Sequence, residues 1–208
     1  ACVRSGRSPT HCSMPVASTG AICKRMPMGS GVTGGLTGEM EIVEGYLPGA
    51  IGRIAEMHGR YYAREWGFGV YFEAKVAREC GEFFERMDDA ADRVWLALDG
   101  GRVVGSLVVD GGAGKNSDAG DAHLRWFVLD DGLRGHGLGA DLMRRAVAFC
   151  DARGVGCYLT TFAGLDAARA LYERHGFRLA QETAAETWGK RVTEQVFERG
   201  VADAGEKS

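Results

Sequence analysis

A run of glycines lies directly in front of a helical pattern in the segment LRGHGLGADLMRRA, residues 133–146. The first amide N–H groups of a helix have no partner within the helix, and the helix dipole adds about half a positive charge there. A pyrophosphate can use both, and glycine lets its oxygens reach the backbone nitrogens. Arg134 can add a charge-assisted contact. We therefore predict a pyrophosphate site built from the amides of Arg134, Gly135, His136, Gly137, Leu138, Gly139 and Ala140.

Other interpretations of these glycines are weaker. A plain turn with a glycine N-cap needs fewer than three glycines. The dinucleotide fingerprint Gly135-x-Gly137-x-x-Ala140 matches in letters only, because the preceding strand ends near Leu129 and no acidic residue ends the next strand. The glycine-rich segment 111–121 lacks the first glycine and the Ser or Thr of a Walker A loop, so we interpret it as a hairpin connection.

The cysteines do not predict a metal site. Cys2, Cys12 and Cys23 are spaced by ten and eleven residues, with His11 beside the second, whereas zinc sites use short Cys-x-x-Cys pairs. We therefore expect no bound metal. The other three cysteines fall on apolar faces and are predicted to be reduced core residues: Cys80, Cys150 and Cys157.

The spacing of apolar residues predicts the elements that must position the glycine loop. Three- and four-residue steps predict helices over 48–66, 72–87, 138–149 and 165–175, the last ending at Gly176. Alternating or apolar runs predict strands over 40–47, 93–99, 102–109, 122–129, 155–162, 177–183 and 191–198. A turn at Asp99-Gly100-Gly101 joins two of them as a β-hairpin. The fold class is therefore α+β, with one mixed, mainly antiparallel central sheet flanked by helices.

Composition divides the chain into three parts. Residues 1–38 are rich in Gly, Ser, Thr and Pro without any period, so we expect a disordered tail, leader or linker before a domain at 39–200, and a disordered tail at 201–208. The chain after residue 38 holds 21 basic and 28 acidic residues, a net charge of −7, which argues against a nucleic-acid partner. No apolar run of about 18 residues and no signal peptide is present, so we expect no membrane partner and a cytoplasmic location.

Two longer segments carry a family resemblance. FVLDDGLRGHGLGADLMRRAVAFCDARG, followed by DAARALYERHGF, resembles motifs A and B of the GCN5-related N-acetyltransferase (GNAT) superfamily. The resemblance covers about residues 40–198, and the paired motifs are more specific than either alone. HGRYYAREWGF, FEAKV and TEQVFE resemble the acetyltransferase domain often fused to MarR-type regulators. This domain is the closest relative that the resemblance suggests.

The resemblance implies a GNAT fold and acetyl-CoA as co-substrate, without a metal. Pantetheine would lie beside the motif A strand and bond to the main chain at Phe127 and Leu129, which flank Val128. Tyr172 occupies the motif B tyrosine position, near the coenzyme sulfur. Relatives often carry asparagine where this sequence has Phe162, which implies that a polar contact to the coenzyme is lost.

The implied reaction is attack by an amine on the thioester. An alkylamine with a pKa near 10.4 is only about 1 in 2,500 neutral at pH 7, so a base would help. Some family members place a glutamate base on the motif A strand, but here that strand offers His123 and Arg125, which leaves the base open. Proton donation from a free tyrosine, with a pKa near 10, to a thiolate with a pKa near 8.5 is uphill by about 2 kcal/mol. Tyr172 must therefore be tuned, or must donate only a hydrogen bond.

The acceptor side is less clearly marked. One group of residues on or just after the first helix either lines an acceptor pocket or packs in the core, with the core as the favoured interpretation: His58, Tyr61, Tyr62, Glu65 and Trp66. Two function classes stay open, an N-acetyltransferase that joins acetyl-CoA to an amine by direct attack, and a catalytically weak acyl-CoA sensor or interaction module. The acceptor is not identified, and a homodimer is one assembly the sequence leaves open.

Overall fold

A computed structural model describes residues 24–26, 40–112, 120–186 and 188–201. The helices of this part are α1 (Ala50–Trp66), α2 (Val70–Arg86), the 3-10 turn η2 (Asp131–Leu133), α3 (Leu138–Ala152) and α4 (Asp166–Arg174). The strands are β1 (Lys24–Met26), β2 (Met40–Glu44), β3 (Arg93–Asp99), β4 (Arg102–Asp110), β5 (Ala122–Leu129), β6 (Cys157–Phe162), β7 (Arg178–Ala185) and β8 (Val192–Arg199).

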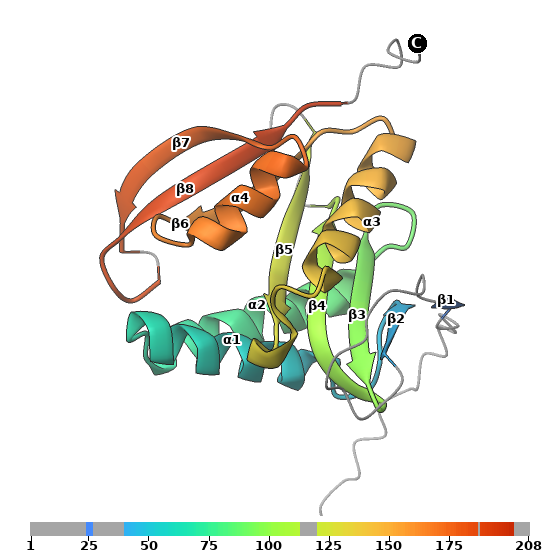
Figure 1. Ribbon diagram of the computed structural model, residues 1–208, viewed down its shortest axis with the longest axis horizontal. Coiled ribbons are helices and arrows are strands. Elements are labelled where there is room, and N and C mark those ends of the chain that lie inside the picture. Colours follow the sequence, from blue (N-terminus) through green and yellow to red (C-terminus); the bar gives the residue numbers. More distant parts are fainter. Residues whose placement is uncertain (1–23, 27–39, 113–119, 187, 202–208) are drawn as a thin grey trace, which may run out of the picture.

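These strands form one sheet in the order β1-β2-β3-β4-β5-β6-β8-β7 (Figure 1). All neighbouring pairs are antiparallel except β5 and β6, which run parallel. The predicted α+β class with a mixed, mainly antiparallel sheet is confirmed. The predicted hairpin is confirmed too: Asp99 pairs with Arg102, and Gly100 and Gly101 take φ values of 55° and 81°, which favour glycine.

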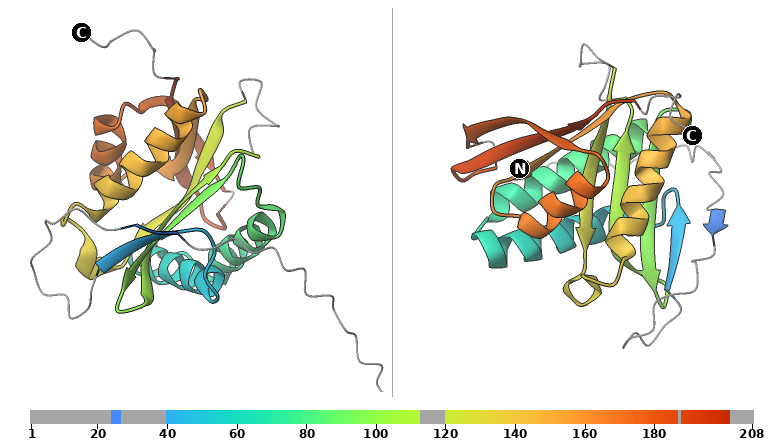
Figure 2. Two further views of the ribbon diagram at one scale, coloured as in Figure 1. Left: turned by 90° about the vertical axis from the view of Figure 1, so that its right-hand side faces the viewer. Right: turned by 45° about the horizontal axis from the view of Figure 1, so that its top comes forward.

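Two helices cover each face of the sheet (Figures 1 and 2). On one face, α1 and α2 pack on residues such as Ile54, Phe72 and Phe83. On the other face, α3 and α4 pack through a second cluster that includes Leu142 and Tyr172. Both clusters are built by the apolar stripes that the three- and four-residue spacing predicts.

The sheet opens between its two parallel strands. β5 and β6 are paired only over Ala122–Leu124 and Cys157–Leu159, so the remainder of β5 separates from β6. A bulge also interrupts the pairing of β4 with β5, and Trp126 within it has a φ of 47°. This bulge changes the alternation: Leu124 packs with the α3 side of the sheet, whereas Trp126, two residues later, packs with the α1 and α2 side.

Several predictions fall partly or wholly outside the described residues. Three cysteines, His11 and most of the expected N-terminal tail lie there, as do segments 113–119 and 202–208. Within the expected tail, residues 24–26 form β1, which pairs antiparallel with β2. The remaining cysteines are free and buried, as predicted: Cys80, Cys150 and Cys157.

Candidate functional site

The N-terminus of α3 presents backbone amides that no side chain caps. Gly137 is the N-cap residue, with a φ of 83°, and no side chain hydrogen bonds at this cap. The first intrahelical bond runs from the Asp141 amide to the Gly137 carbonyl at 3.0 Å, so the amides of residues 138–140 have no acceptor within the helix. The physical requirement for the predicted anion site, free donors at a helix N-terminus, is therefore met.

The three loop glycines are needed for two different reasons. Gly135 and Gly137 have φ values of 81° and 83°, and a Cβ at either position would enter open space. They permit a left-handed backbone that other residues adopt at a cost. Gly139 instead lies against hydrophobic side chains, because a Cβ there would lie 3.3 Å from Phe127 Cζ and 3.4 Å from Leu129 Cδ1. Gly139 thus allows α3 to approach β5 closely.

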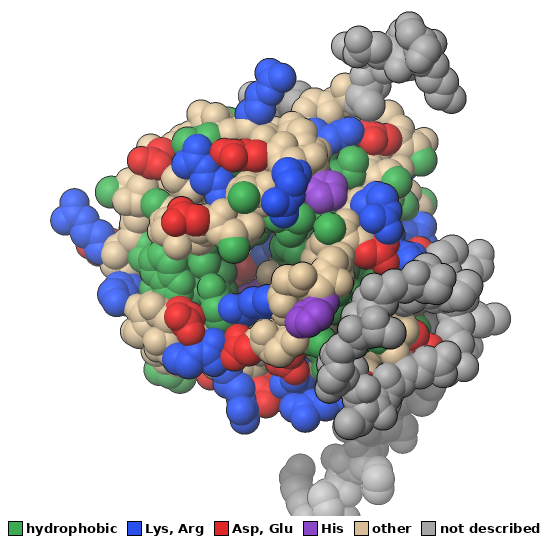
Figure 3. All heavy atoms as spheres, in the orientation of Figure 1, with side chains coloured by type: hydrophobic (Ala, Val, Ile, Leu, Met, Phe, Trp, Pro, Cys, Tyr) green, Lys and Arg blue, Asp and Glu red, His purple; other side chains and the backbone are tan. Residues whose placement is uncertain are grey.

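A cavity of about 710 Å³ lies in front of these amides. Figure 3 shows a hollow between α4 and the loop before α3, with basic side chains at its rim. The structure brings nine of the predicted site residues to this cavity: Phe127, Val128, Leu129, Arg134, Gly135, Gly137, Gly139, Ala140 and Tyr172. Two others do not line it, because the His136 side chain is exposed and the Leu138 side chain is buried in the core.

Ion pairs from α1 hold the segment that leads into the glycine loop. Arg53 forms an ion pair with Asp130 and donates from Nε to the Val103 carbonyl at 2.8 Å. Arg64 donates two hydrogen bonds to the Asp131 carboxylate, at 2.6 and 3.0 Å, and this contact lowers the pKa of Asp131. These contacts fix the end of β5 and the start of the loop relative to α1.

The Arg134 side chain lies folded back in this structure. Its guanidinium carbon is 4.1 Å from the centroid of the Tyr61 ring, and Nη2 lies 3.3 Å from an Asp131 oxygen. The side chain is well exposed, and the arginine lines the cavity. Its charge is therefore at the mouth of the cavity without being buried in an internal pair.

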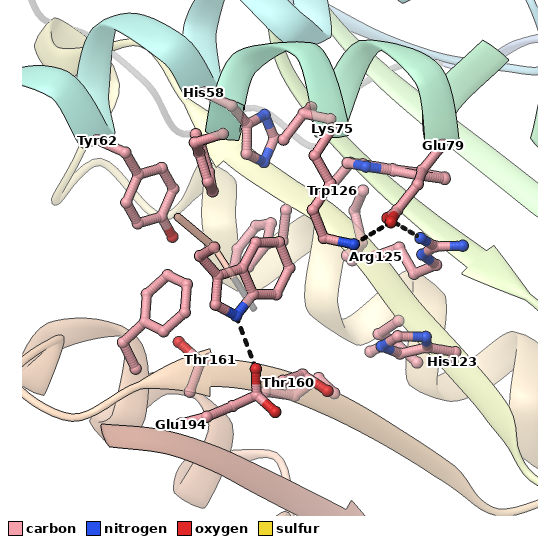
Figure 4. A pocket seen from close by; sticks show the side chains of 18 of the residues that line it. His58, Tyr62, Lys75, Glu79, His123, Arg125, Trp126, Thr160, Thr161 and Glu194 are labelled. Carbon is pink, nitrogen blue, oxygen red and sulfur yellow. Dashed lines mark hydrogen bonds and ion pairs between the residues drawn. The ribbon is translucent and has the colours of Figure 1, made fainter. Parts of the chain in front are cut away.

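A second cavity, of about 360 Å³, lies on the α1 and α2 side of the sheet (Figure 4). It meets the larger cavity at three residues that line both: Tyr62, Phe127 and Tyr172. Of these three, Phe127 lies in the part of β5 that is not paired with β6. A long ligand in the larger cavity could therefore present one end to a second molecule in the smaller cavity.

Tyr172 stands at this junction with its hydroxyl protonated. The side chain is only 7% exposed, and its ring packs on Phe127, Phe177 and Phe197. Burial raises the pKa of Tyr172, although a hydrogen bond with Thr161 lowers it. A neutral hydroxyl in this position can donate a hydrogen bond but gives up its proton reluctantly.

Charged side chains in the smaller cavity are mostly paired with one another. Glu79 forms ion pairs with Lys75 and with Arg125, the latter at 2.7 Å (Figure 4). Arg125 also lies 3.2 Å from a carboxylate oxygen of Asp110. On the opposite wall, Glu194 accepts a hydrogen bond from the Trp188 indole at 2.6 Å.

Two histidines line the same cavity in their neutral form. His58 is 6% exposed, and its Nδ1 lies 2.9 Å from the Ile54 carbonyl, so Nδ1 carries the proton and donates. Burial lowers the pKa of His58 to about 4. Burial and the nearby Arg125 lower the pKa of His123 to about 3, and its ring stacks on Tyr158.

The residues proposed for an acceptor pocket divide between pocket and packing. His58 and Tyr62 line the smaller cavity, whereas Trp66 packs in an aromatic cluster with Phe68 and Phe162. Glu65 forms an ion pair with Arg64. Phe162 lines the smaller cavity and does not line the larger one.

Sequence reasoning missed four polar or aromatic residues of the smaller cavity: Lys75, Glu79, Trp188 and Glu194. Lys75 and Glu79 are four residues apart on α2, which is the ordinary spacing of an exposed helical ion pair. Glu194 stands in a strand and Trp188 in the turn before it. The one sequence signal for this site was that Glu194 shares a strand face with apolar residues.

Comparisons with known proteins now define the class. The model of the Acetyltransferase (GNAT) family matches residues 53–177, and the chain belongs to this family. A search of the curated proteins finds no significant match. The part of the chain that the structure describes has no helix long and apolar enough to cross a membrane. Within the same part, no group of three His, Cys, Asp or Glu side chains could hold a metal ion.

Solved structures share the fold at low sequence identity. A GNAT-family acetyltransferase from Staphylococcus aureus Mu50 superimposes with a TM-score of 0.62 at 17% identity, covering 79% of this chain and all of its own. The ribosomal-protein-S18-alanine N-acetyltransferase from Escherichia coli gives 0.56 at 18%, covering 82% and 99%. The ribosomal L7/L12 α-N-protein acetyltransferase RimL in complex with coenzyme A gives 0.59 at 12%, covering 86% and 98%.

Proposed function

We propose that this GNAT-family protein transfers an acetyl group from acetyl-CoA to an amine, by direct attack of the amine on the thioester. One observation carries the proposal: the uncapped amides of α3 face a large cavity that joins a smaller one beside Tyr172. Pyrophosphate on these amides would anchor the coenzyme. Pantetheine would then follow β5 along Phe127 and Leu129 and bring the thioester to the junction.

In the proposed reaction, the acceptor enters from the smaller cavity and its nitrogen attacks the thioester carbon. The tetrahedral intermediate places negative charge on the carbonyl oxygen, and a backbone amide of β5 would stabilise that charge. The intermediate expels the coenzyme thiolate and the nitrogen loses a proton. Because both reactants are held at one junction, the reaction no longer depends on a collision between free molecules. This effect supplies a large part of the expected rate gain.

Tyr172 is proposed to donate a hydrogen bond to the departing sulfur. Because burial raises the pKa of Tyr172, complete proton transfer to a thiolate would be less favourable than from a free tyrosine. The structure therefore favours the hydrogen-bond role over the tuned-acid role. The proton of the amine can leave toward the neutral imidazoles or the carboxylate of the smaller cavity.

Finer aspects of the function stay predictions. We propose that the nearest relatives are the acetyltransferase domains fused to MarR-type regulators, on the strength of the segments HGRYYAREWGF, FEAKV and TEQVFE. A cytoplasmic location and the absence of nucleic-acid and membrane partners are further predictions of this kind, and a homodimer is one assembly left open.

The test is a calorimetric titration with acetyl-CoA, followed by an assay for released thiol with a panel of amines. Gly137→Ala adds a Cβ and strains the anion loop, and we expect it to weaken acetyl-CoA binding at least tenfold. Gly154→Ala is the matched control, because Gly154 also has a positive φ of 64° and open space but lies beyond the other end of α3. Equal affinities for both variants would contradict the proposed anchor. Tight acetyl-CoA binding without thiol release for any amine would favour the sensor alternative.

A further inference from the structure

Two polar groups of the smaller cavity, each able to accept a further hydrogen bond, indicate which kind of ligand the cavity binds. Four charged side chains line it: Lys75, Glu79, Arg125 and Glu194. The two cations are both paired with Glu79. Within the described residues, Glu194 has no cationic partner, and its hydrogen bond comes from the neutral Trp188 indole at 2.6 Å. Among the charged side chains that line the cavity, Glu194 is thus the one without an ion pair in the described part of the chain.

His58 adds a second uncommitted acceptor. Its Nδ1 is occupied by the Ile54 carbonyl at 2.9 Å, which leaves Nε2 as an unprotonated acceptor in the neutral ring. Nε2 has no hydrogen-bond partner in the described part of the chain, although the residue is only 6% exposed. No fully buried side-chain nitrogen or oxygen of the described residues lacks a hydrogen-bond partner, so Nε2 opens on the cavity, where a ligand or solvent can donate to it. Both groups can thus accept N–H donors, and the Glu194 carboxylate can also bind a cation.

The rest of the wall is apolar and aromatic. Phe72 and Phe162 pack against Trp188, with ring centroids 5.8 and 5.3 Å away, and Tyr62 packs against Phe162 at 5.7 Å. Rings of this kind attract a cation across their faces and also accommodate a hydrocarbon body. Lys75 lies 5.1 Å from the centroid of the Trp188 ring, a cation–π contact that already engages this indole.

Size and closure favour a small molecule over a protein chain. The cavity volume of about 360 Å³ is near the lower end of the range for small-molecule sites. The turn between β7 and β8 crosses to the link between α1 and α2, where Lys190 Nζ donates to the Trp66 carbonyl at 2.6 Å. Trp188 extends from the same turn onto Phe72 of α2. These contacts close one side of the smaller cavity, so an extended peptide has no path there.

We infer that the acceptor is a small primary amine with an apolar body, bound as an ammonium ion by Glu194 between aromatic walls. The inference rests on the proposed acetyl transfer, because it names the substrate class of that same site. Glu194 binds the cation, and the indole N–H of Trp188 fixes the orientation of the carboxylate. The ammonium ion passes one proton to a neutral imidazole or a carboxylate of this cavity, as in the proposed reaction, and His58 Nε2 accepts a further N–H as the neutral amine moves toward the thioester.

The test compares three ligands that share a phenylethyl body and differ in the charge of the end group. 2-Phenylethylamine, neutral 2-phenylethanol and anionic 3-phenylpropanoate are each titrated by calorimetry into the protein loaded with coenzyme A. We expect the amine to bind at least tenfold more tightly than the alcohol and the anion not to bind. Absence of amine binding at millimolar concentration, or binding of the alcohol or the anion as tight as that of the amine, would overturn the inference.

Variants test the role of Glu194 directly. Glu194→Gln keeps the shape and removes the charge, and we expect it to lower kcat/KM for the amine by about 10- to 100-fold, mainly through KM. Glu198→Gln is the matched control, since Glu198 is an exposed residue of the same strand outside both cavities. An unchanged KM in Glu194→Gln, or faster acetylation of peptide N-termini than of small amines, would also overturn it. Acetyl-CoA titrations and the thiol-release assay on the unmodified protein separate this failure from failure of the proposed function, which would appear as no coenzyme binding or as no thiol release with any amine.

Discussion

Replacing Tyr172 by phenylalanine isolates the hydroxyl at the junction of the two cavities. The ring keeps its contacts with Phe127, Phe177 and Phe197, whose centroids lie 5.8 to 6.4 Å away, so no cavity forms. The loss of the hydrogen bond with Thr161 costs about 1 kcal/mol of stability. The variant should therefore fold and can be compared with the unmodified protein at one temperature.

The size of the kinetic effect distinguishes two roles for this hydroxyl. A hydrogen bond to a group that becomes charged is worth about 1.5–3 kcal/mol, which corresponds to a 10- to 150-fold loss of kcat. Full proton donation by a general acid contributes up to about 10⁴-fold. Since burial raises the pKa of Tyr172, we expect the smaller loss. For the same reason, ionisation of Tyr172 should produce no fall in rate between neutral pH and pH 10.

The assay is release of coenzyme thiol at saturating acetyl-CoA, with the coenzyme affinity measured separately by calorimetry. We expect kcat to fall 10- to 150-fold while the acetyl-CoA Kd changes less than threefold. Equal losses in kcat and affinity would make Tyr172 a binding or packing residue. An unchanged kcat would remove it from the reaction altogether, and either result would refute the assignment.

Further predictions follow from buried groups. The pKa of His58 is lowered from 6.5 to about 4, so the folded protein binds fewer protons than the unfolded chain and stability falls as the pH drops through that window, by about 3 kcal/mol in all. Urea unfolding from pH 7 to pH 4.5 should show this fall, and His58→Leu should make it smaller without removing it, because burial also lowers the pKa of His123, to about 3. Parallel curves for the two proteins would contradict the assigned cause. Phe162→Asn, which restores the residue common in relatives, should cost about 3 kcal/mol because Phe162 is 4% exposed, without tightening acetyl-CoA binding. Urea unfolding and calorimetry would check both parts, and a gain in affinity would show that residue 162 reaches the coenzyme.

Part of the larger cavity could be predicted because it is continuous in sequence. The segment 127–140 supplies the end of β5, the loop and the start of α3, whereas the rest of the wall comes from α1 and from residues 164–174. Glycine spacing before a helical pattern carries a physical meaning that does not depend on the rest of the fold. The helices and the β3–β4 hairpin were likewise predictable, since each is set by local periodicity or by turn residues such as Gly100 and Gly101.

The acceptor side could not be predicted in this way. Its wall combines α1, α2, β5, β6 and the residues from 188 to 194, and no short pattern joins them. Glu79 and Lys75 have the spacing of an ordinary surface pair, and only the fold turns them toward Arg125. Glu194 differs from the other strand carboxylates only in the residues that surround it, and the tertiary fold determines those residues.

The bulge at Trp126 determines which side chains of β5 line each cavity. In a regular strand, Leu124 and Trp126 would point to the same face of the sheet, and Arg125 and Phe127 to the other. With the bulge, Arg125 and Trp126 line only the smaller cavity, whereas Phe127 packs toward α3 and reaches both. One irregular residue thus places the second half of β5 along the larger cavity and its first half along the smaller one. A sequence pattern that assumes strict alternation assigns these side chains to the wrong cavities.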